Sequence, residues 1–388
     1  MQYRPYGSTG WQVSALGFGC MRLPRTGDDK IDEPEAERMV KYAIENGVNY
    51  IDTAYGYHRG ESERFLGRIL KDGWREKVRL VTKLPCWHVN EAGDFDRLFN
   101  EQLEKLQTDH LDAYLLHALN KDAWEKVHRL GVLDWLHKLK SSGRVGAVGF
   151  SFHDSFEVFK VIHADNDWDV CQIQYNYMNE NHQAGTEGLK YAAALGVGVI
   201  IMEPLLGGKL ATPPEVVRKI WEAGTLSISP AEWALQWLWS KSEVSIVLSG
   251  MSTKEQVVEN VRSASRSGLG NLTKDELDLV ERVRAAYEAI VPIPCTACEY
   301  CLPCPNGVLI PKNFEIFNVG VMYGDIAGAR REYEWLGKRE GDTALAEACQ
   351  QCEDCETKCP QNILISQWMP YVRDVLGRGK AYDPAVTF

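Results

Sequence analysis

Residues 112–151 read DAYLLHALNKDAWEKVHRLGVLDWLHKLKSSGRVGAVGFS, and this stretch decides the fold. It opens with a short β-type run, DAYLLH (112–117), and closes with another, VGAVGFS (145–151). The helical pattern between them ends in WLHKLKSSG, where Gly143 suits the left-handed position that follows a helix. The stretch therefore predicts a strand, a helix and a second strand, which is the repeating unit of a parallel sheet.

The same alternation recurs before and after this stretch. The other strand candidates are GFGCM (17–21), NYID (49–52), RLVTKL (79–84), VCQIQY (170–175), VGVIIM (197–202) and SIVLSG (245–250). Helix starts are signalled at Ser62, at Ser229, which precedes a proline, and at Ser252, which begins a capping box. Eight alternations favour a closed (β/α)8 TIM barrel over an open doubly wound sheet, and no GxGxxG follows the first strand.

The alternation of predicted strands and helices ends around VPIPC (291–295), where a cysteine-rich segment begins. We therefore expect an α/β barrel over residues 1–290 and a smaller, mainly helical domain over residues 291–388. A chain of 388 residues is long enough for both domains.

Composition and charge narrow the class of protein. Hydrophobic residues at 45% and charged residues at 25% are ordinary globular values. A net charge of −11 argues against nucleic acid or an anionic membrane as a partner. We see no signal peptide in MQYRPYGSTGWQVSALG and no apolar run of the ~18–20 residues that a membrane span needs. We expect a cytoplasmic protein.

Four ionisable side chains lie at the carboxyl ends of neighbouring predicted strands or in the loop that follows, where barrel enzymes perform their chemistry. They are Asp52, Tyr57, Lys83 and His117. Reduction of a carbonyl needs a proton on oxygen, and a phenol with a pKa of about 10 is a weak donor at neutral pH. A neighbouring ammonium lowers that pKa, a carboxylate keeps the ammonium charged, and an imidazole can orient the carbonyl. The set predicts a proton-donating site.

The segment DTAYGYHRGESE (52–63), the lysine of VTKLP and the histidine of YLLHAL resemble the aldo-keto reductase superfamily in both sequence and order. The resemblance extends over roughly residues 1–290. It implies reduction of a small-molecule aldehyde or ketone, with Tyr57 as proton donor. The hydride would come from NADP or NAD bound across the barrel mouth.

The resemblance also implies the contacts of this cofactor. The residues concerned are Ser151, Gln172, Pro204, Leu205, Gly207, Gly208, Gly250, Ser252, Lys254, Gln256 and Asn260. Two positions depart from the family. Phe152, with His153 after it, stands where asparagine is frequent, and Met202 stands where an aromatic ring usually stacks on the nicotinamide.

A third departure concerns the 2′-phosphate of NADP. Gly250 and Gln256 stand where basic residues often hold it. Lys254, with the hydroxyls of Ser252 and Thr253, could take over this role. The family resemblance still favours NADP over NAD, and the choice stays open here.

Eight of the eleven cysteines lie in two motifs that end in CP. They are Cys295, Cys298, Cys301 and Cys304 in CTACEYCLPCP, and Cys349, Cys352, Cys355 and Cys359 in CQQCEDCETKCP. In a reducing compartment, thiols at fixed spacing favour metal over disulfides. The second motif matches the bacterial ferredoxin run, whereas the first is one residue shorter before its last cysteine.

Two [4Fe–4S] clusters are the leading interpretation, with one cluster or zinc as alternatives. A cubane needs one thiolate per iron, whereas zinc sites usually use two separated CxxC pairs. In the ferredoxin run the fourth cysteine binds the other cluster. This implies Cys295, Cys298 and Cys301 with Cys359, and Cys349, Cys352 and Cys355 with Cys304. From end to end the chain resembles aldo-keto reductases with a C-terminal ferredoxin-like domain.

Two functions remain open at this point. The leading hypothesis is an NAD(P)H-dependent oxidoreductase whose clusters serve electron transfer to a protein partner, redox sensing or structural support. The alternative is a non-catalytic redox-sensing or electron-relay protein on a reductase-like barrel. Hydride transfer moves two electrons and a cluster moves one, so we expect no direct transfer between them.

Overall fold

The computed structural model describes residues 1–28, 30–224, 226–295, 297 and 299–388, so Cys298 lies outside the described residues. Contacts divide the chain into two compact units. The first comprises Met1–Gly208 and Ile228–Leu277, and the second comprises Lys209–Ser227 and Asp278–Phe388. Because segments before residue 290 group with the second unit, the boundary at that residue stays a prediction.

The first unit contains a closed barrel of eight parallel strands. In chain order they are β3 (Leu16–Gly19), β4 (Tyr50–Asp52), β5 (Arg79–Leu84), β6 (Leu111–Leu119), β7 (Val145–Phe152), β8 (Val170–Gln174), β9 (Gly198–Met202) and β10 (Val244–Gly250). Each strand pairs with the next, and β10 pairs with β3 to close the ring. All eight predicted strands are present, and the (β/α)8 prediction is confirmed.

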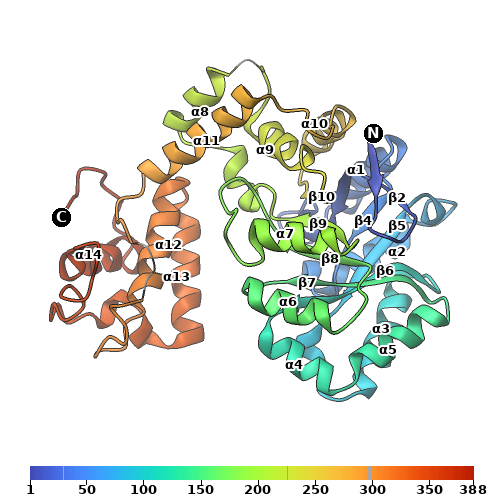
Figure 1. The fold of residues 1–388 in the computed structure, drawn as a ribbon, viewed down its shortest axis with the longest axis horizontal. Helices are drawn as coiled ribbons and strands as arrows, with labels where there is room; N and C mark the ends of the chain where they lie inside the picture. Colours follow the sequence, from blue (N-terminus) through green and yellow to red (C-terminus); the bar gives the residue numbers. More distant parts are fainter. Residues whose placement is uncertain (29, 225, 296, 298) are drawn as a thin grey trace. The chain divides into compact units, whose positions relative to one another are not determined.

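Helices surround this barrel (Figure 1). They are α1 (Glu33–Glu45), α2 (Glu61–Ile69), α3 (Gly93–Leu106), α4 (Lys121–Arg129), α5 (Val132–Ser141), α6 (Phe156–Ala164), α7 (Gly185–Ala194), α9 (Pro230–Trp239) and α10 (Lys254–Ser265). Ser229 caps α9, and Gly143 has a φ of +75° after α5, as predicted. Two cap predictions are wrong, because α2 begins before Ser62 and Thr253, not Ser252, caps α10.

An N-terminal hairpin that the sequence did not predict covers the amino end of the barrel. It consists of β1 (Tyr3–Pro5) and β2 (Gln12–Ser14). The buried Tyr6 hydroxyl lies 2.9 Å from that of Tyr50 inside the barrel. Gly7 has a φ of +55°, and a Cβ there would stand 2.5 Å from the backbone nitrogen of Gly198, so no side chain fits. The hairpin therefore closes the amino end of the barrel by tight packing.

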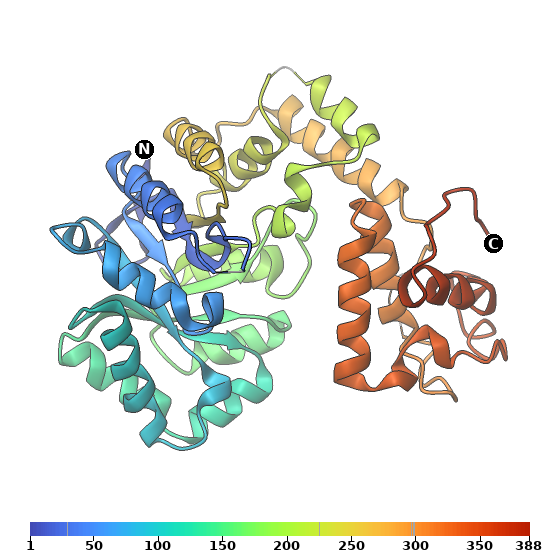
Figure 2. The same ribbon diagram turned by 180° about the vertical axis from the view of Figure 1, so that it is seen from behind.

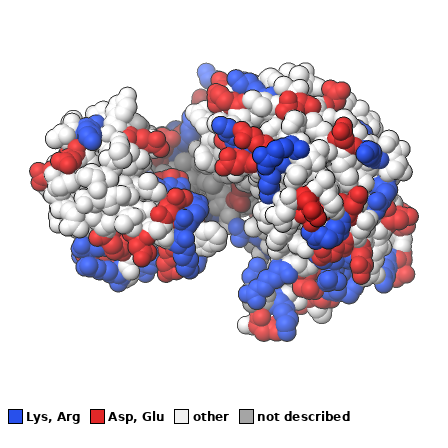
Figure 3. All heavy atoms as spheres, turned by 90° about the horizontal axis from the view of Figure 1, so that it is seen from below, with Lys and Arg blue, Asp and Glu red and all other residues white. Residues whose placement is uncertain are grey.

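Acidic and basic side chains are interspersed over the face of the molecule that Figure 3 shows. This is the pattern expected of amphipathic helices whose other face packs on the strands. Among the residues that the structure describes, no helix is both long and apolar enough to cross a membrane.

The second unit is helical, as predicted. Its helices are α8 (Glu215–Glu222), most of α11 (Lys274–Ala289), α12 (Ile310–Met322), α13 (Ile326–Glu340) and α14 (Ile365–Val372). Helices α12 and α13 lie side by side (Figures 1 and 2). Buried Phe314, Phe317, Tyr333, Trp368 and Met369 belong to its own hydrophobic core, against which the cysteine loops pack.

Candidate active site

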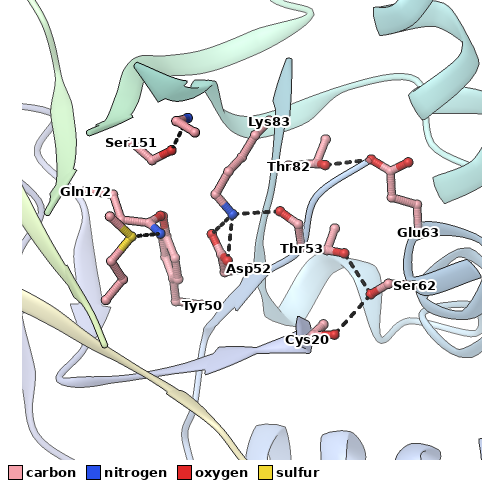
Figure 4. A network of polar contacts seen from close by, with 12 residues as sticks. Cys20, Tyr50, Asp52, Thr53, Ser62, Glu63, Thr82, Lys83, Ser151 and Gln172 are labelled. Carbon is pink, nitrogen blue, oxygen red and sulfur yellow. Dashed lines mark hydrogen bonds and ion pairs between the residues drawn. The ribbon is translucent and has the colours of Figure 1, made fainter. Parts of the chain in front are cut away.

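The centre of the site is a buried ion pair between two neighbouring strands. Asp52 is the last residue of β4, and Lys83 is the penultimate residue of β5. The Lys83 ammonium lies 2.7 and 2.8 Å from the two Asp52 carboxylate oxygens and 2.8 Å from the Thr53 carbonyl oxygen (Figure 4). Burial is the largest single influence and would lower the pKa of Lys83, but the interactions with Asp52 and Tyr57 together outweigh it, and the pKa is raised. Lys83 is therefore a fixed positive charge.

Tyr57 lies beside this ammonium, in a single turn that follows β4. The Lys83 nitrogen is 5.2 Å from the centre of the Tyr57 ring, close enough for its charge to act on the phenol. Burial raises the pKa of Tyr57, and the charge of Lys83 offsets only part of that rise. The expected lowering by Lys83 is thus present, but burial exceeds it. At neutral pH the phenol keeps its proton.

His117, on β6, completes the group. Its ring centre is 6.1 Å from that of Tyr57, and the two rings are nearly perpendicular. Burial and then the nearby Lys83 charge lower the pKa of His117 well below its usual value, so the imidazole is neutral. Its buried Nδ1 atom has no hydrogen-bond partner among the described residues. Trp87, half exposed, has its ring 4.9 Å from that of His117 and is a wall of the site.

Ser151 on β7 and Gln172 on β8 stand across the barrel mouth from Lys83 (Figure 4). The Ser151 hydroxyl oxygen accepts a hydrogen bond from the Ala118 N–H at 2.7 Å, which leaves its own proton to donate. The Gln172 amide donates to the Met202 sulfur at 3.4 Å. The buried carbonyl oxygen of Gln172 has no partner in the described part of the chain.

Phe152 does not replace the asparagine that the family often has there. Successive strand residues point to opposite faces, so Phe152 points away from Ser151. It is fully buried, with its ring 5.0 Å from that of Phe159 on α6. The following residue, His153, is largely buried near Gln183, and burial lowers the pKa of its imidazole.

Two glycines and one arginine define the next part of the mouth. Gly207 and Gly208, which follow Pro204 and Leu205, have φ values of +67° and +99°, a conformation that favours glycine. A Cβ at Gly207 would stand 3.2 Å from Nη2 of Arg22, and one at Gly250 would stand 3.2 Å from Cβ and Cγ of Arg22. The Arg22 side chain therefore runs from one glycine towards the other.

At the far end of the mouth, the residues expected to hold the adenosine side contact other residues of the protein. The Ser252 hydroxyl donates to the Arg22 carbonyl at 2.9 Å, and the Ser252 N–H donates to the Gln256 side chain at 2.8 Å. Asn260 donates to the Ser249 hydroxyl at 3.0 Å. The Lys254 ammonium stands 3.3 Å from the centre of the Tyr42 ring on α1.

The structure brings described cysteines of the two motifs close together in the second unit. Cys295, Cys301 and Cys359 line one cavity, together with the apolar Phe314 and Ile365. Cys298, the fourth member of that set, lies outside the described residues. In the other set, Cys304 and Cys352 are both close enough to Cys349 to contribute, after burial, to its raised pKa. Cys355 is likewise close to Cys349, and also to Cys301.

The two cysteine loops share one backbone pattern. Ala297 and Glu299 have φ values of +52° and +62°, and Gln351 and Glu353 have φ values of +54° and +65°. These residues stand two and four positions after the first cysteine of each motif. Left-handed residues in a tight loop can turn backbone N–H groups to one side, which suits an anionic iron–sulfur group. The described left-handed positions therefore correspond in the two loops.

Comparison with known proteins identifies the barrel. The model of the aldo/keto reductase family matches residues 15–285. This chain belongs to that family. A second model, described as a 4Fe-4S dicluster domain, matches residues 294–364 of the reductase. The protein is thus an aldo-keto reductase-type oxidoreductase with a C-terminal 4Fe–4S domain.

Relatives cover most of this reductase. L-galactose dehydrogenase of Arabidopsis thaliana is 28% identical over 309 residues, which is 73% of this chain and 94% of its own. Protein tas of Escherichia coli (strain K12) is 25% identical over 350 residues, or 74% and 99% of the two chains. The holo form of an aldo-keto reductase from Bacillus halodurans has a TM-score of 0.62 at 26% identity, covering 73% of this chain and 96% of that one.

The mouth of the reductase fits a nicotinamide cofactor. A carboxamide both donates and accepts hydrogen bonds, and the Ser151 hydroxyl and the unpaired Gln172 oxygen offer both partners. Arg22, which the sequence reasoning missed, places a guanidinium against Gly207. The signal was present, since Arg22 closely follows the carboxyl end of β3, the same end of the barrel at which Asp52, Lys83 and His117 lie.

The cysteine loops of the reductase fit a cubane better than a single ion. Across the described residues, no three His, Cys, Asp or Glu side chains lie close enough together to hold one metal ion. In a cubane each thiolate binds a different iron, so its ligands stand further apart than those around one ion. A shared cavity lined by three thiols, as with Cys295, Cys301 and Cys359, meets that wider requirement.

Proposed function

We propose that this reductase converts an aldehyde or ketone to an alcohol, with Tyr57 as the proton donor. The observation that supports this best is the position of the Tyr57 phenol beside the buried Lys83–Asp52 pair and the neutral His117. Bound NADPH or NADH would supply the hydride to the carbonyl carbon. Tyr57 then gives its proton to the carbonyl oxygen, and the Lys83 charge stabilises the phenolate that remains.

The other two members of the group have distinct tasks in this proposal. Asp52 keeps Lys83 charged and directs it, because both carboxylate oxygens accept from the ammonium. His117 is neutral, so it can donate a hydrogen bond to the carbonyl oxygen without competing for the proton. Ser151 and Gln172 would hold the carboxamide of the cofactor. Gly207 and Gly208 would allow the backbone to approach the pyrophosphate.

Two variants can resolve the choice between NADPH and NADH, because two basic side chains border different parts of the barrel mouth. Arg22→Ala should weaken NADPH and NADH alike, by roughly tenfold, because Arg22 lies at the pyrophosphate loop that both share. Lys254→Ala should weaken NADPH alone, if Lys254 leaves Tyr42 to bind the 2′-phosphate. Dissociation constants from nicotinamide fluorescence titration measure both effects. Lys71→Ala, at an exposed position just after α2, is the control.

We expect wild-type protein to bind NADPH more tightly than NADH. Equal affinities would remove Lys254, Ser252 and Thr253 from the 2′-phosphate site and leave the rest of the cofactor assignment in place. Loss of NADPH affinity alone in Arg22→Ala would instead move Arg22 from the pyrophosphate to the 2′-phosphate.

We also infer that the second unit holds two [4Fe–4S] clusters with exchanged fourth ligands. The shared cavity of Cys295, Cys301 and Cys359 and the closeness of Cys304 to Cys349 support this pairing. The identical left-handed positions in both loops support two like clusters rather than one. Their role in this proposal is one-electron transfer with a protein partner, or redox sensing.

A panel of aldehydes and ketones with NADPH and NADH tests the proposed reaction. The panel should include L-galactose in the oxidative direction, because a 28% identical relative is named for that sugar. Turnover of at least one substrate that disappears in Lys83→Met supports the proposal. Full cofactor binding with no turnover across the panel would favour the redox-sensing alternative.

A further inference from the structure

The loop that presents Tyr57 has an unusual backbone. It leaves β4 at Thr53 and enters α2 at Glu61, directly before Ser62. Directly after Tyr57, His58, Arg59 and Gly60 are all left-handed, with φ values of +51°, +58° and +90°. Side chains with a Cβ are strained in this region, so the surroundings must hold the turn in place. The position of the phenol therefore depends on what fixes the two ends of the loop.

A hydrogen bond between two buried hydroxyls joins these ends. The Thr53 and Ser62 side-chain oxygens are 2.8 Å apart, and both residues are fully buried. Ser62 donates its own proton to the Cys20 carbonyl oxygen at 3.4 Å, so Thr53 is the donor to Ser62. A chain from Thr53 through Ser62 to Cys20 thus connects the loop to the end of β3 (Figure 4).

Thr53 also contacts Lys83 directly. Its carbonyl oxygen accepts from the Lys83 ammonium at 2.8 Å, and its N–H donates to the Val81 carbonyl at 2.9 Å. The main chain of Thr53 is therefore fixed to β5, while its side chain fixes the far end of the Tyr57 loop. Thr53 thus contacts the Lys83 ammonium through its carbonyl oxygen. It contacts the far end of the Tyr57 loop through its hydroxyl.

A second contact holds the same turn of α2 against the same strand. Glu63, next to Ser62 and fully buried, accepts from the Thr82 hydroxyl at 2.6 Å. Thr82 is the neighbour of Lys83, and the Gln102 amide donates both to Glu63 and to the Lys83 carbonyl at 3.0 Å. Helix α2 is thus anchored independently, so loss of the Thr53–Ser62 bond would release the loop without detaching the helix.

We propose that the Thr53–Ser62 hydrogen bond is a positioning clasp that sets the Tyr57 hydroxyl against Lys83. This rests on the proposed role of Tyr57 as proton donor. Neither Thr53 nor Ser62 touches the reacting atoms in this proposal. They act through Tyr57, because they close the loop from which its side chain projects.

The test replaces Thr53 with valine, which removes the side-chain hydroxyl and keeps the side-chain volume. Thr53→Val should lower kcat for carbonyl reduction roughly 10- to 100-fold, the range expected when a catalytic group is misplaced by about 1 Å. The dissociation constant for NADPH should not change. Thr53→Ser retains the hydroxyl and should restore most of the activity. In a Tyr57→Phe background, Thr53→Val should cause no further loss, because its effect passes through the missing phenol.

Controls separate this inference from the proposed function. Thr186→Val, which removes the hydroxyl contact between Thr186 on α7 and Tyr175, should leave kcat unchanged. Wild-type kcat in Thr53→Val, or an equal loss with and without the Tyr57 phenol, would overturn the clasp. Undiminished activity in Tyr57→Phe would overturn the proton donor itself. If Thr53→Val does not fold, Ser62→Ala removes the same bond and is judged by the same outcomes.

Discussion

Tyr57→Phe is expected to lower carbonyl reduction by at least about 100-fold, the low end for loss of a general acid. The substitution removes one oxygen and its proton and leaves the ring in place. Lys83 and Asp52 keep their ion pair, because the ammonium has two carboxylate oxygens and the Thr53 carbonyl as acceptors without the phenol. The cofactor should therefore bind as before, and the loss should appear in kcat.

Single-turnover reduction, followed by the absorbance of NADPH, measures this loss. Tyr3→Phe is the matched control, since it removes a hydroxyl that bonds to the Gly47 carbonyl at the amino end of the barrel. Its rate should equal that of the wild type. Turnover near the wild-type rate in a folded Tyr57→Phe protein would remove Tyr57 from the role of acid, and His117 would then be the next residue to test.

The second large effect concerns the clusters. Protein purified without oxygen should be brown and contain about eight irons per chain, four for each cubane. Cys359→Ser should disturb the cluster held by Cys295 and Cys301, although these cysteines are more than fifty residues away in the chain. The reason is the cavity that all three line. The cluster built on Cys349 should persist and leave about four irons.

Iron analysis and electron paramagnetic resonance of the reduced protein measure this outcome. Cys86→Ser, at a buried cysteine outside both motifs, should keep all the iron. Cys304→Ser should give the reciprocal result, with loss of the cluster on Cys349. A colourless protein with two zinc ions per chain would contradict the cluster assignment. About four irons in the wild type would show that one motif is empty.

The barrel could be predicted from the sequence because its determinants are local and repeated. Each strand is a short apolar run, and Gly143 and Ser229 mark helix ends by their own conformational preferences. Ser62 failed as a cap signal because its hydroxyl is used in a buried contact with Thr53. The N-terminal hairpin escaped prediction because its short strands have no alternation long enough to recognise.

The site was predictable to the extent that strand ends converge. Asp52 and Lys83 were expected to meet because they end adjacent parallel strands, and their distance confirms the contact. The pKa of Tyr57 could not be predicted, since burial depends on packing that no motif encodes. Arg22 lay outside the motif residues, and its direction depends on Gly207 and Gly250, which are distant in the chain.

Because the N-terminal hairpin closes the amino end of the barrel, it restricts how reactants can enter and leave. Tyr6 occupies the interior, and Gly7 fits against Gly198 without room for a side chain, so nothing passes through the lower end. Under the proposed function, the reactants and products would share the carboxyl-end mouth of the barrel. Whichever reactant sat deeper there would enter first and leave last. A segment that contacts neither reactant would thus set their order.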